Sequence, residues 1–418
     1  MSEPFASTRR KFLARTGALG ITAGTASPPL AQTAQPPNVP EWMRAPGEPV
    51  LWRKYGLPSE FEQNVVRRFN PTRRMKVPGE GPSYTPLQDL HGTITPSGLV
   101  FERHHSGIPN IDPAQHRLMV HGLVKQPMVF SIEDLARFPS VSRIYFLECS
   151  GNTNTEYRAP VAKSVQESHG LFSNCEWTGV MLSTILEQVG LQPDAHWILA
   201  EGADAAAMTR SVPIAKCLDD AMLVYTQNGE ALRPEQGYPL RLLLPGWEGN
   251  MSIKWLRRIK VASEPFMTRE ETSKYTDLMP DGRSRQFSFV MEAKSVITFP
   301  SAGHKLKERG FYEISGLAWS GSGRISRVHV SIDGGRNWRE AQIQEPILSR
   351  AAVRFSLPWR WEGGEAILQS RVIDETGYVQ PTRQQIISVR GTGPWFYHNN
   401  AIQSWKVSPS GEITNVHT

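Results

Sequence analysis

Cysteine is scarce in this sequence: its 418 residues contain three, Cys149, Cys175 and Cys217. Three thiols cannot all pair, and none stands in a Cys-x-x-Cys or His-rich spacing, so the sequence indicates neither a disulfide scaffold nor a structural zinc site. No Cys-x-x-Cys-His motif is present, which excludes covalent attachment of a c-type haem to this chain. No apolar run reaches the roughly 18 residues that a membrane-spanning helix needs.

The excess of basic over acidic residues is also small. The formal net charge is +6, and residues 1–34 supply half of it, because they hold four basic residues and one acidic residue. The remaining excess is too small for the basic surface of a nucleic-acid-binding protein. With 39% apolar and 21% charged residues the composition is that of a soluble globular protein, and 418 residues predict two or three domains.

The N-terminus carries a distinct pattern. Residues 7–13 are Ser-Thr-Arg-Arg-Lys-Phe-Leu, a mildly apolar stretch rich in Ala, Gly and Thr follows to Thr25, and residues 28–34 end on small side chains. This order resembles a twin-arginine signal peptide over residues 1–34, and a basic amphipathic helix end is the alternative. The resemblance implies export to the bacterial periplasm by a route that carries folded proteins, often with a cofactor already inserted.

Changes in composition divide the rest of the chain. Residues 35–90 are dense in Pro, Arg and Gly, which favours an extended N-terminal arm. In residues 91–285, strand-like runs alternate with helical patterns such as 182–189, as in a mixed α+β domain. Residues 286–400 break into short strands typical of a β-sandwich, and 401–418 form a C-terminal tail. The predicted strands are 117–122, 143–148, 239–244 and 255–261, then 295–299, 310–318, 327–332, 364–374 and 384–389.

The most pointed local feature is Cys149, which follows an apolar strand and precedes Ser150-Gly151-Asn152. A strand end with a glycine turn exposes a thiol to a cleft, where a thiolate can bind a soft or high-valent metal or act as a nucleophile. The alternative is a buried, inert cysteine, which is our interpretation of Cys175 and Cys217. No papain-like or caspase-like signature surrounds Cys149, so a cysteine-protease role has little support.

Three other segments supply groups that an anionic ligand needs. Adjacent His104 and His105 point to opposite faces of a strand, so with Arg103 they fit a phosphate or a ring edge better than one metal ion. Arg241 lies inside an apolar strand, where its charge is costly to bury unless an anion or carboxylate pairs with it. Tyr275 stands in a polar stretch with no evident core, and is either a site residue or a surface tyrosine.

In one order along residues 90–395, these segments resemble the sulfite oxidase family of molybdenum enzymes. The resemblance covers Phe101 to His105, Cys149 to Asn152, Pro239-Leu240-Arg241 with Pro245-Gly246, Ile253 to Leu256, and 318–321, 330–335 and Trp338. It implies an α+β fold in which a molybdopterin-binding catalytic domain is followed by an immunoglobulin-like β-sandwich dimerisation domain. It also implies the residues of the site, taken position by position from the matching motifs.

By this resemblance the Cys149 thiolate is the protein ligand of molybdenum, and Tyr275, Arg103 and Arg390 form the substrate pocket around an oxyanion. Cys149 therefore belongs both to the catalytic set and to the cofactor-binding set. The other residues expected to hold the pterin and its phosphate are Phe101, Arg103, His104, His105, Asp204, Gln236, Arg241, Ser252, Ile253 and Lys254.

Two positions depart from the sulfite-oxidising relatives. Asn154 stands where they carry an arginine, and Gln236 stands where they carry a histidine. Fewer cations weaken the case for free sulfite and favour a substrate presented by a protein. Segments 121–124, 138–143, 291–298 and 395–405 resemble one branch, the sulfane dehydrogenase catalytic subunits of the periplasmic sulfur-oxidising (Sox) system. That branch implies a separate haem c cytochrome subunit, a heterotetramer built on a homodimer, and a carrier-protein cysteine that holds the sulfur.

We therefore expect an exported molybdopterin oxidoreductase that oxidises carrier-bound sulfane sulfur with oxygen from water and passes electrons to a cytochrome c. A free-sulfite dehydrogenase is the alternative within the same class. A non-catalytic periplasmic binding module is the rival from another class, although it leaves Cys149 and the export signal unexplained.

Overall fold

The computed structural model describes residues 55–69, 79–391 and 397–418. Residue contacts divide the chain into two compact units, 1–60 and 61–418, and every described sheet lies in the second. The predicted signal peptide and residues 35–54 and 70–78 of the predicted arm lie outside the described residues.

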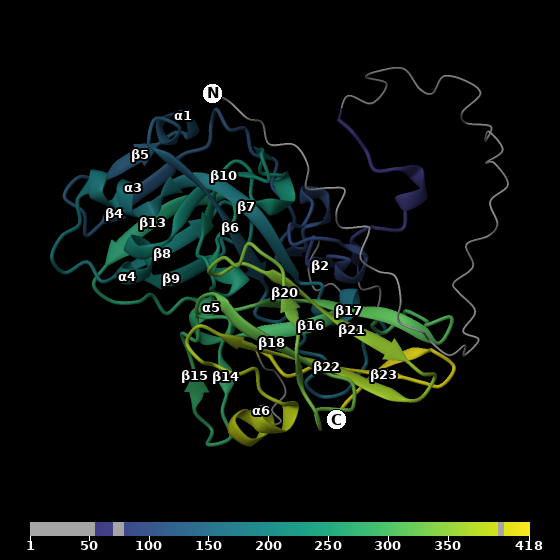
Figure 1. Cartoon of the computed structure of the whole chain (residues 1–418). Coiled ribbons are helices and arrows are strands. Elements are labelled where there is room, and N and C mark those ends of the chain that lie inside the picture. The colour runs from purple at the N-terminus through teal and green to yellow at the C-terminus, as the bar shows by residue number, and fades with distance from the viewer. Residues whose placement is uncertain (1–54, 70–78, 392–396) are drawn as a thin grey trace, which may run out of the picture. The chain divides into compact units, whose positions relative to one another are not determined.

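Two five-stranded sheets form the body of the first domain (Figure 1). The first has the order β11-β10-β7-β6, with β12 beside β10, and all its neighbours are antiparallel. The second has the order β5-β4-β13-β8-β9 and contains one parallel pair, β4 with β13. The strands of the first sheet are β6 (Ser140–Glu148), β7 (Phe172–Met181), β10 (Met222–Gln227), β11 (Glu230–Ala231) and β12 (Arg241–Leu243). Those of the second are β4 (Leu118–Gly122), β5 (Met128–Phe130), β8 (Trp197–Gly202), β9 (Thr209–Pro213) and β13 (Leu256–Ala262).

Short helices and two small sheets complete this domain. The predicted helix at 182–189 is confirmed as α3 (Leu182–Val189), because Leu182, Ile185, Leu186 and Val189 recur every three or four residues and are all buried. The other helices are α1 (Ile132–Leu135), α2 (Val165–His169), α4 (Ile214–Asp219) and α5 (Arg269–Thr272), with 3-10 turns at Glu60–Glu62, Leu87–Asp89, Ser97–Leu99, Pro234–Gln236 and Gly249–Met251. The small sheets are β1 (Arg68–Phe69), β2 (Gly81–Tyr84) and β3 (Glu102–His104), and the ribbon of β14 (Asp277–Leu278) and β15 (Ser284–Arg285).

Two antiparallel sheets make up the β-sandwich, with the strand orders β16-β17-β21-β20 and β19-β18-β22-β23-β24. Buried apolar side chains from both sheets form one core. The strands of the first sheet are β16 (Lys294–Phe299), β17 (Gly310–Trp319), β20 (Gln342–Ile343) and β21 (Val353–Trp361). Those of the second are β18 (Ile325–Ser331), β19 (Arg339–Glu340), β22 (Ala366–Asp374), β23 (Ser404–Val407) and β24 (Ile413–Val416). The α+β class and the sandwich are thus as predicted.

Two expectations for the C-terminal region differ from the structure. The strand predicted at 384–389 is wrong, because Thr382 and Gln385 form a capping box that starts a helix, α6 (Arg383–Arg390). The segment 401–418, expected as a tail, contains β23 and β24, which extend the sheet from β22.

The first domain and the sandwich share a core. Phe146 and Phe172, from β6 and β7, belong to the same buried cluster as the sandwich residues, and the Phe172 ring stacks on Trp319 with a centroid distance of 4.0 Å. Burying these aromatic surfaces together stabilises the junction. Within the described residues, no helix is long and apolar enough to cross a membrane.

Candidate functional site

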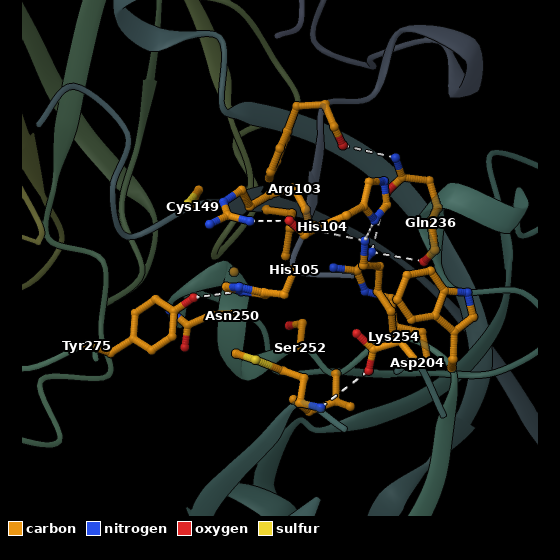
Figure 2. A pocket seen from close by; sticks show the side chains of 17 residues that line it. Arg103, His104, His105, Cys149, Asp204, Gln236, Asn250, Ser252, Lys254 and Tyr275 are labelled. Atoms are coloured by element: carbon orange, nitrogen blue, oxygen red, sulfur yellow. Dashed lines mark hydrogen bonds between the residues drawn. The ribbon is translucent and has the colours of Figure 1, made fainter. Parts of the chain in front are cut away.

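One pocket of about 670 Å³, its open mouth included, lies where loops and strand ends of the first domain meet (Figure 2). All the predicted site residues except Arg390 line it: Phe101, Arg103, His104, His105, Cys149, Asp204, Gln236, Arg241, Ser252, Ile253, Lys254 and Tyr275. Leu147, Met208, Gly249, Asn250 and Trp255 also line it and were not predicted. The sequence therefore brings together residues that are up to 174 positions apart, from Phe101 to Tyr275, around one cavity.

Cys149 lies at the end of β6, half-buried, in the wall of this pocket. Its backbone N–H donates to Leu171 O at 3.0 Å, and its carbonyl accepts from the N–H of Asn152 at 2.8 Å, so both sides of the thiol-bearing residue are fixed. Gly249 packs against the same strand end: a Cβ there would come within 2.7 Å of Glu148 O, so only glycine fits.

The other two cysteines lie outside the pocket lining and are fully buried. Burial raises the pKa of the Cys175 thiol to about 12, and it raises the pKa of Cys217 further above its ordinary value. Both therefore remain protonated thiols, which agrees with the inert interpretation made for them.

Arg241 supplies a buried positive charge to the pocket. Its Nη1 donates to Gln236 O at 3.0 Å, whereas its Nε has no hydrogen-bond partner, and no described carboxylate pairs with it within 4.0 Å. Burial lowers its pKa to about 10, so it remains a cation at neutral pH. An arginine that is buried without a carboxylate indicates that an anion completes its environment.

Lys254 lies near this arginine and contacts residues of β3 at one end of the pocket. Its Nζ donates to Arg103 O at 3.3 Å and to Glu235 O at 3.1 Å, and it lies 2.8 Å from His104 Nδ1. Burial, together with the positive charge of Arg241, places its pKa well below the ordinary value. Burial also lowers the pKa of His104, which is therefore neutral at pH 7.

Arg103 projects into the same part of the pocket. Its guanidinium donates to His104 O and lies 3.6 Å from the carboxylate of Glu80, which directly precedes β2. This ion pair links the start of β2 to β3. Together with Arg241 and Lys254, Arg103 gives the pocket three basic side chains, against the single lining carboxylate of Asp204. This balance favours an anionic ligand.

The remaining predicted residues form hydrogen bonds with backbone groups of the segments around the pocket. Gln236 Nε2 donates to Phe101 O at 2.9 Å, which joins the turn before β12 to the start of β3. Ser252 Oγ accepts from Leu244 N–H at 3.1 Å, and Asp204 Oδ1 accepts from Met208 N–H at 3.3 Å. The Ile253 carbonyl accepts from Leu242 N–H at 2.9 Å.

Tyr275 and His105 point toward each other in the pocket lining, with Tyr275 Oη 3.2 Å from His105 Nε2 (Figure 2). Burial raises the pKa of the Tyr275 phenol, so its hydroxyl remains protonated and can donate a hydrogen bond. Burial and the charge of Arg103 lower the pKa of His105 to about 3, so this imidazole is neutral. The pair therefore offers neutral hydrogen-bonding groups beside the basic ones.

Arg390 lies outside the pocket lining, on the last turn of α6. Its Nη2 lies 2.8 Å from Glu292 Oε1 and its Nη1 donates to His398 O at 3.0 Å. The guanidinium thus has a carboxylate partner of its own, in contrast to Arg241. Its expected place in the substrate pocket stays a prediction. Asn154, one of the two departures noted above, is likewise absent from the lining.

A buried cluster of charges that the sequence did not reveal lies next to the pocket. Glu248 accepts from Asn250 Nδ2 at 2.7 Å and from His398 Nε2 at 2.8 Å, and lies 3.6 Å from Arg210. The Arg210 guanidinium in turn lies 5.0 Å from the centre of the Tyr275 ring. Asn250 also donates to Ser150 Oγ at 3.0 Å, so the cluster contacts the turn after Cys149 and two lining residues.

Several residues around the site hold a backbone conformation that favours glycine. Thr153, Trp255, Tyr275 and His398 have φ of 65°, 52°, 47° and 60°. Such values cost a side-chain-bearing residue on the order of 1 kcal/mol, and they persist only where surrounding contacts enforce them. The site is therefore a preorganised part of the fold.

Two family models match consecutive parts of the chain. The oxidoreductase molybdopterin binding domain matches residues 105–270, and the Mo-co oxidoreductase dimerisation domain matches residues 285–405. These ranges correspond to the sheets around the pocket and to the sandwich.

Comparisons with individual proteins give the same result. The chain is 32% identical over 342 residues to the mitochondrial sulfite oxidase of Mus musculus, and 31% identical over 317 residues to the sulfite oxidase of Gallus gallus. These alignments cover 75% and 69% of this chain, and 62% and 68% of those proteins. The crystal structure of the sulfane dehydrogenase SoxCD from Paracoccus pantotrophus is 47% identical with a TM-score of 0.88, and the match covers 94% of this chain and 100% of that one.

Proposed function

Because this chain belongs to the sulfite oxidase family of molybdopterin oxidoreductases, we propose that it is the catalytic subunit of a sulfane dehydrogenase. Its substrate would be sulfane sulfur held on a carrier-protein cysteine. Each oxygen atom transferred from water to the sulfur releases two protons and two electrons, and the electrons would pass to a cytochrome c. One observation carries the proposal: Cys149 lines the same pocket as Arg241, a buried arginine whose Nε has no hydrogen-bond partner.

The pocket fits the molybdenum cofactor by the chemistry of its groups. The Cys149 thiolate would be the metal ligand, since thiolate is a soft donor at the end of a fixed strand. Arg241 would bind the phosphate of the pterin, because it is a buried cation whose Nε lacks a partner. Once bound, the cofactor supplies oxygen-atom transfer and accepts the two electrons.

The substrate side of the pocket would be formed by Arg103, Tyr275 and His105. Arg103 attracts and orients an anionic sulfur group, as a guanidinium offers several fixed donors. The Tyr275 hydroxyl, kept protonated by burial, donates a hydrogen bond to the oxygen that gains charge during transfer. His105 is neutral and lies 3.2 Å from that hydroxyl, so it orients Tyr275 without adding charge.

Two observations favour carrier-bound sulfane over free sulfite. The match to the SoxCD sulfane dehydrogenase is 47% identical, against 30–33% for the sulfite oxidases. Asn154 and Gln236 replace the arginine and histidine expected of a sulfite-oxidising site, which leaves less positive charge for a free dianion. Free-sulfite oxidation is the second candidate, favoured by the relatives that carry the name sulfite oxidase.

The partners and the location follow from the same proposal. The match to a dimerisation domain supports a homodimer formed through the sandwich. A cytochrome c subunit would receive the electrons, because the sequence has no attachment motif for haem of its own. The twin-arginine pattern of residues 1–34 supports a periplasmic enzyme that is loaded with its cofactor before export. Family membership stands against a non-catalytic binding module.

The deciding experiment measures molybdenum per chain in protein exported by a host that makes molybdopterin, for the wild type and for Cys149→Ser. We expect about one atom per chain in the wild type and a large loss, or an altered metal spectrum, in the variant. Loaded enzyme is then supplied with cytochrome c and either a persulfidated carrier peptide or sulfite. Turnover of the carrier sulfur at a lower KM supports the proposal, whereas efficient turnover of sulfite alone favours the second candidate. Folded wild-type protein without molybdenum would overturn both.

A further inference from the structure

Glu148 is the last residue of β6 and directly precedes Cys149, yet its side chain points away from the pocket and is fully buried. Three donors surround its carboxylate. Lys294 Nζ lies 2.6 Å from Oε1 and Trp319 Nε1 donates to Oε2 at 2.7 Å. The third donor, Asn152 Nδ2, lies 3.0 Å from Oε1.

Two of these donors belong to the sandwich. Lys294 begins β16 and Trp319 ends β17, and both side chains are almost wholly buried. Because each carboxylate oxygen has a sandwich donor, the side chain of Glu148 cannot rotate without leaving a buried charge unsatisfied. The sandwich therefore fixes the end of a strand in the other domain.

The third donor fixes the turn that follows Cys149. Asn152 Nδ2 also donates to His169 O at 3.1 Å, and its Oδ1 accepts from Leu171 N–H at 3.2 Å. Thr153, held at a positive φ of 65°, donates through Oγ1 to Asn399 O at 2.7 Å. Cys149 thus lies between two anchored residues, Glu148 before it and Asn152 after it.

We propose that Glu148 is a positioning residue that sets the direction of the Cys149 thiolate, and that Lys294 and Trp319 of the sandwich hold Glu148 in place. The proposal rests on the function proposed above in one respect, the role of Cys149 as the metal ligand. Residues that orient a metal ligand influence the metal without contacting it. Their loss commonly lowers metal affinity or enzyme activity about tenfold or more. The dimerisation domain would in this way contribute to catalysis across the domain junction.

Trp319→Phe tests this with the smallest change. It removes the indole N–H from Glu148 and keeps an aromatic ring to pack against Phe172. Trp405→Phe is the matched control: Trp405 is equally buried in the sandwich, and its indole N–H donates to a backbone carbonyl, Ile297 O, at 3.0 Å. Both variants remove the same atoms from a fully buried position, so a difference between them reports the bond to Glu148.

Three quantities are measured on the full exported chain: the electron paramagnetic resonance spectrum of partly reduced molybdenum, kcat and KM, and deuterium exchange of residues 149–154. For Trp319→Phe we expect shifted molybdenum g values, a kcat lowered about tenfold with KM within about twofold, and faster exchange confined to that turn. Trp405→Phe should match the wild type in all three. Identical spectra and exchange in the two variants would overturn the positioning role.

The outcome is separable from that of the proposed function. If the exported wild type holds no molybdenum, the proposed function fails, and the exchange comparison alone decides whether the sandwich fixes the Cys149 turn. If Trp319→Phe does not accumulate as folded protein, Lys294→Arg replaces it, since this change keeps the positive charge and alters its geometry. A shifted metal spectrum or faster exchange in Lys294→Arg supports the proposal, and wild-type values for both would overturn it.

Discussion

His398 Nε2 lies 2.8 Å from Glu248 Oε1, and both side chains are buried to within 1% of their surface. The pair joins two parts of the chain that are 150 residues apart. On one side Glu248 accepts from Asn250, which lines the pocket. On the other side His398 Nδ1 lies 3.5 Å from Glu292, which pairs with Arg390 at 2.8 Å. A chain of buried charges thus links α6 of the sandwich region to the candidate active site.

This pair predicts a specific pH dependence of stability. Burial alone would lower the pKa of His398, but the carboxylates of Glu248 and Glu292 outweigh it and raise that pKa to about 10. A pKa raised above its unfolded value contributes stability that is fully present below about pH 6.5 and is lost as the pH rises toward 10. We expect His398→Gln to lower the free energy of unfolding by about 3 kcal/mol at pH 6, with the difference from wild type shrinking above pH 7.

Thermal unfolding at pH 6, 8 and 10 checks this expectation. His417→Gln is the control, since His417 is a partly exposed histidine that lies 2.8 Å from a backbone carbonyl, Glu156 O, and forms no ion pair with a carboxylate of the described residues. A difference between wild type and His398→Gln that stays constant over this pH range would contradict the assignment of a charged His398.

The same pair also predicts a loss of stability in acid. Burial would raise the pKa of Glu248, but the positive charge of His398 and its hydrogen bond, with Arg210, lower it to about 2. A lowered carboxylate pKa contributes stability that is present above about pH 4.5 and is lost as the pH falls toward 2. Glu248→Gln should therefore differ most from wild type above pH 5 and least near pH 2, as judged by thermal unfolding. Glu156→Gln, which alters a buried carboxylate away from the pocket lining, provides the comparison.

Arg390→Ala distinguishes a structural role of this arginine from the predicted role in the substrate pocket. The structure pairs its guanidinium with Glu292, so we expect a loss of about 1 to 3 kcal/mol in stability and a smaller effect on KM than Arg103→Ala produces. Steady-state kinetics and thermal unfolding of both variants give the comparison. A KM raised more than tenfold in Arg390→Ala at unchanged stability would instead support the predicted place in the substrate pocket.

Arg241→Met should lower the retention of the cofactor. Removing the buried cation deletes charge-assisted hydrogen bonds to an anion, each worth about 1.5 to 3 kcal/mol, which corresponds to a loss of affinity of about tenfold to a hundredfold. Molybdenum per chain after dialysis measures it. Arg354→Met is the control, because Arg354 is a buried arginine that donates to the carbonyls of Gly92 and Leu90, away from the pocket. Equal molybdenum in the two variants would contradict the phosphate-binding role.

Tyr275→Phe should lower kcat about tenfold to a hundredfold with a smaller change in KM, because the hydroxyl is proposed to stabilise charge that develops during transfer. The raised pKa of Tyr275 also predicts that kcat shows no break from this residue between pH 6 and 9. Tyr312→Phe serves as the control, since the Tyr312 hydroxyl donates to Glu308 O at 2.8 Å in the sandwich. Unchanged kcat in Tyr275→Phe would remove this residue from the mechanism.

Part of the pocket could be predicted from the residues themselves because they stand at strand ends, whereas most of the other cofactor-binding residues were predicted only from the family resemblance. Cys149 follows β6, Arg103 and His104 end β3, and Arg241 begins β12. Polar residues at such places are costly inside a core and are therefore conspicuous in an apolar run. Asn250 escaped notice, although it stands two residues before the predicted segment that begins at Ser252.

What was missed depends on contacts between distant residues or on competing local signals. The Glu248–His398 pair spans 150 positions, and neither residue is unusual in its local sequence. At 384–389 the β-branched residues favour a strand, but the Thr382 and Gln385 capping box favours a helix, and the helix forms. The strand β23 has buried Trp405 and Val407 two residues apart, a period of two that a search for strands in the last residues could have found.

The stacking of Phe172 on Trp319 limits the modularity of this protein. The two family models divide the chain near residue 285, yet contacts place residues 61–418 in one compact unit, and side chains from both sides of that division form one core. Cutting the chain there would expose aromatic surface on both fragments. It would also leave the buried Lys294 without its partner, the Glu148 carboxylate. Swapping the catalytic half between relatives should therefore succeed only when the facing strands β16 and β17 are exchanged with it.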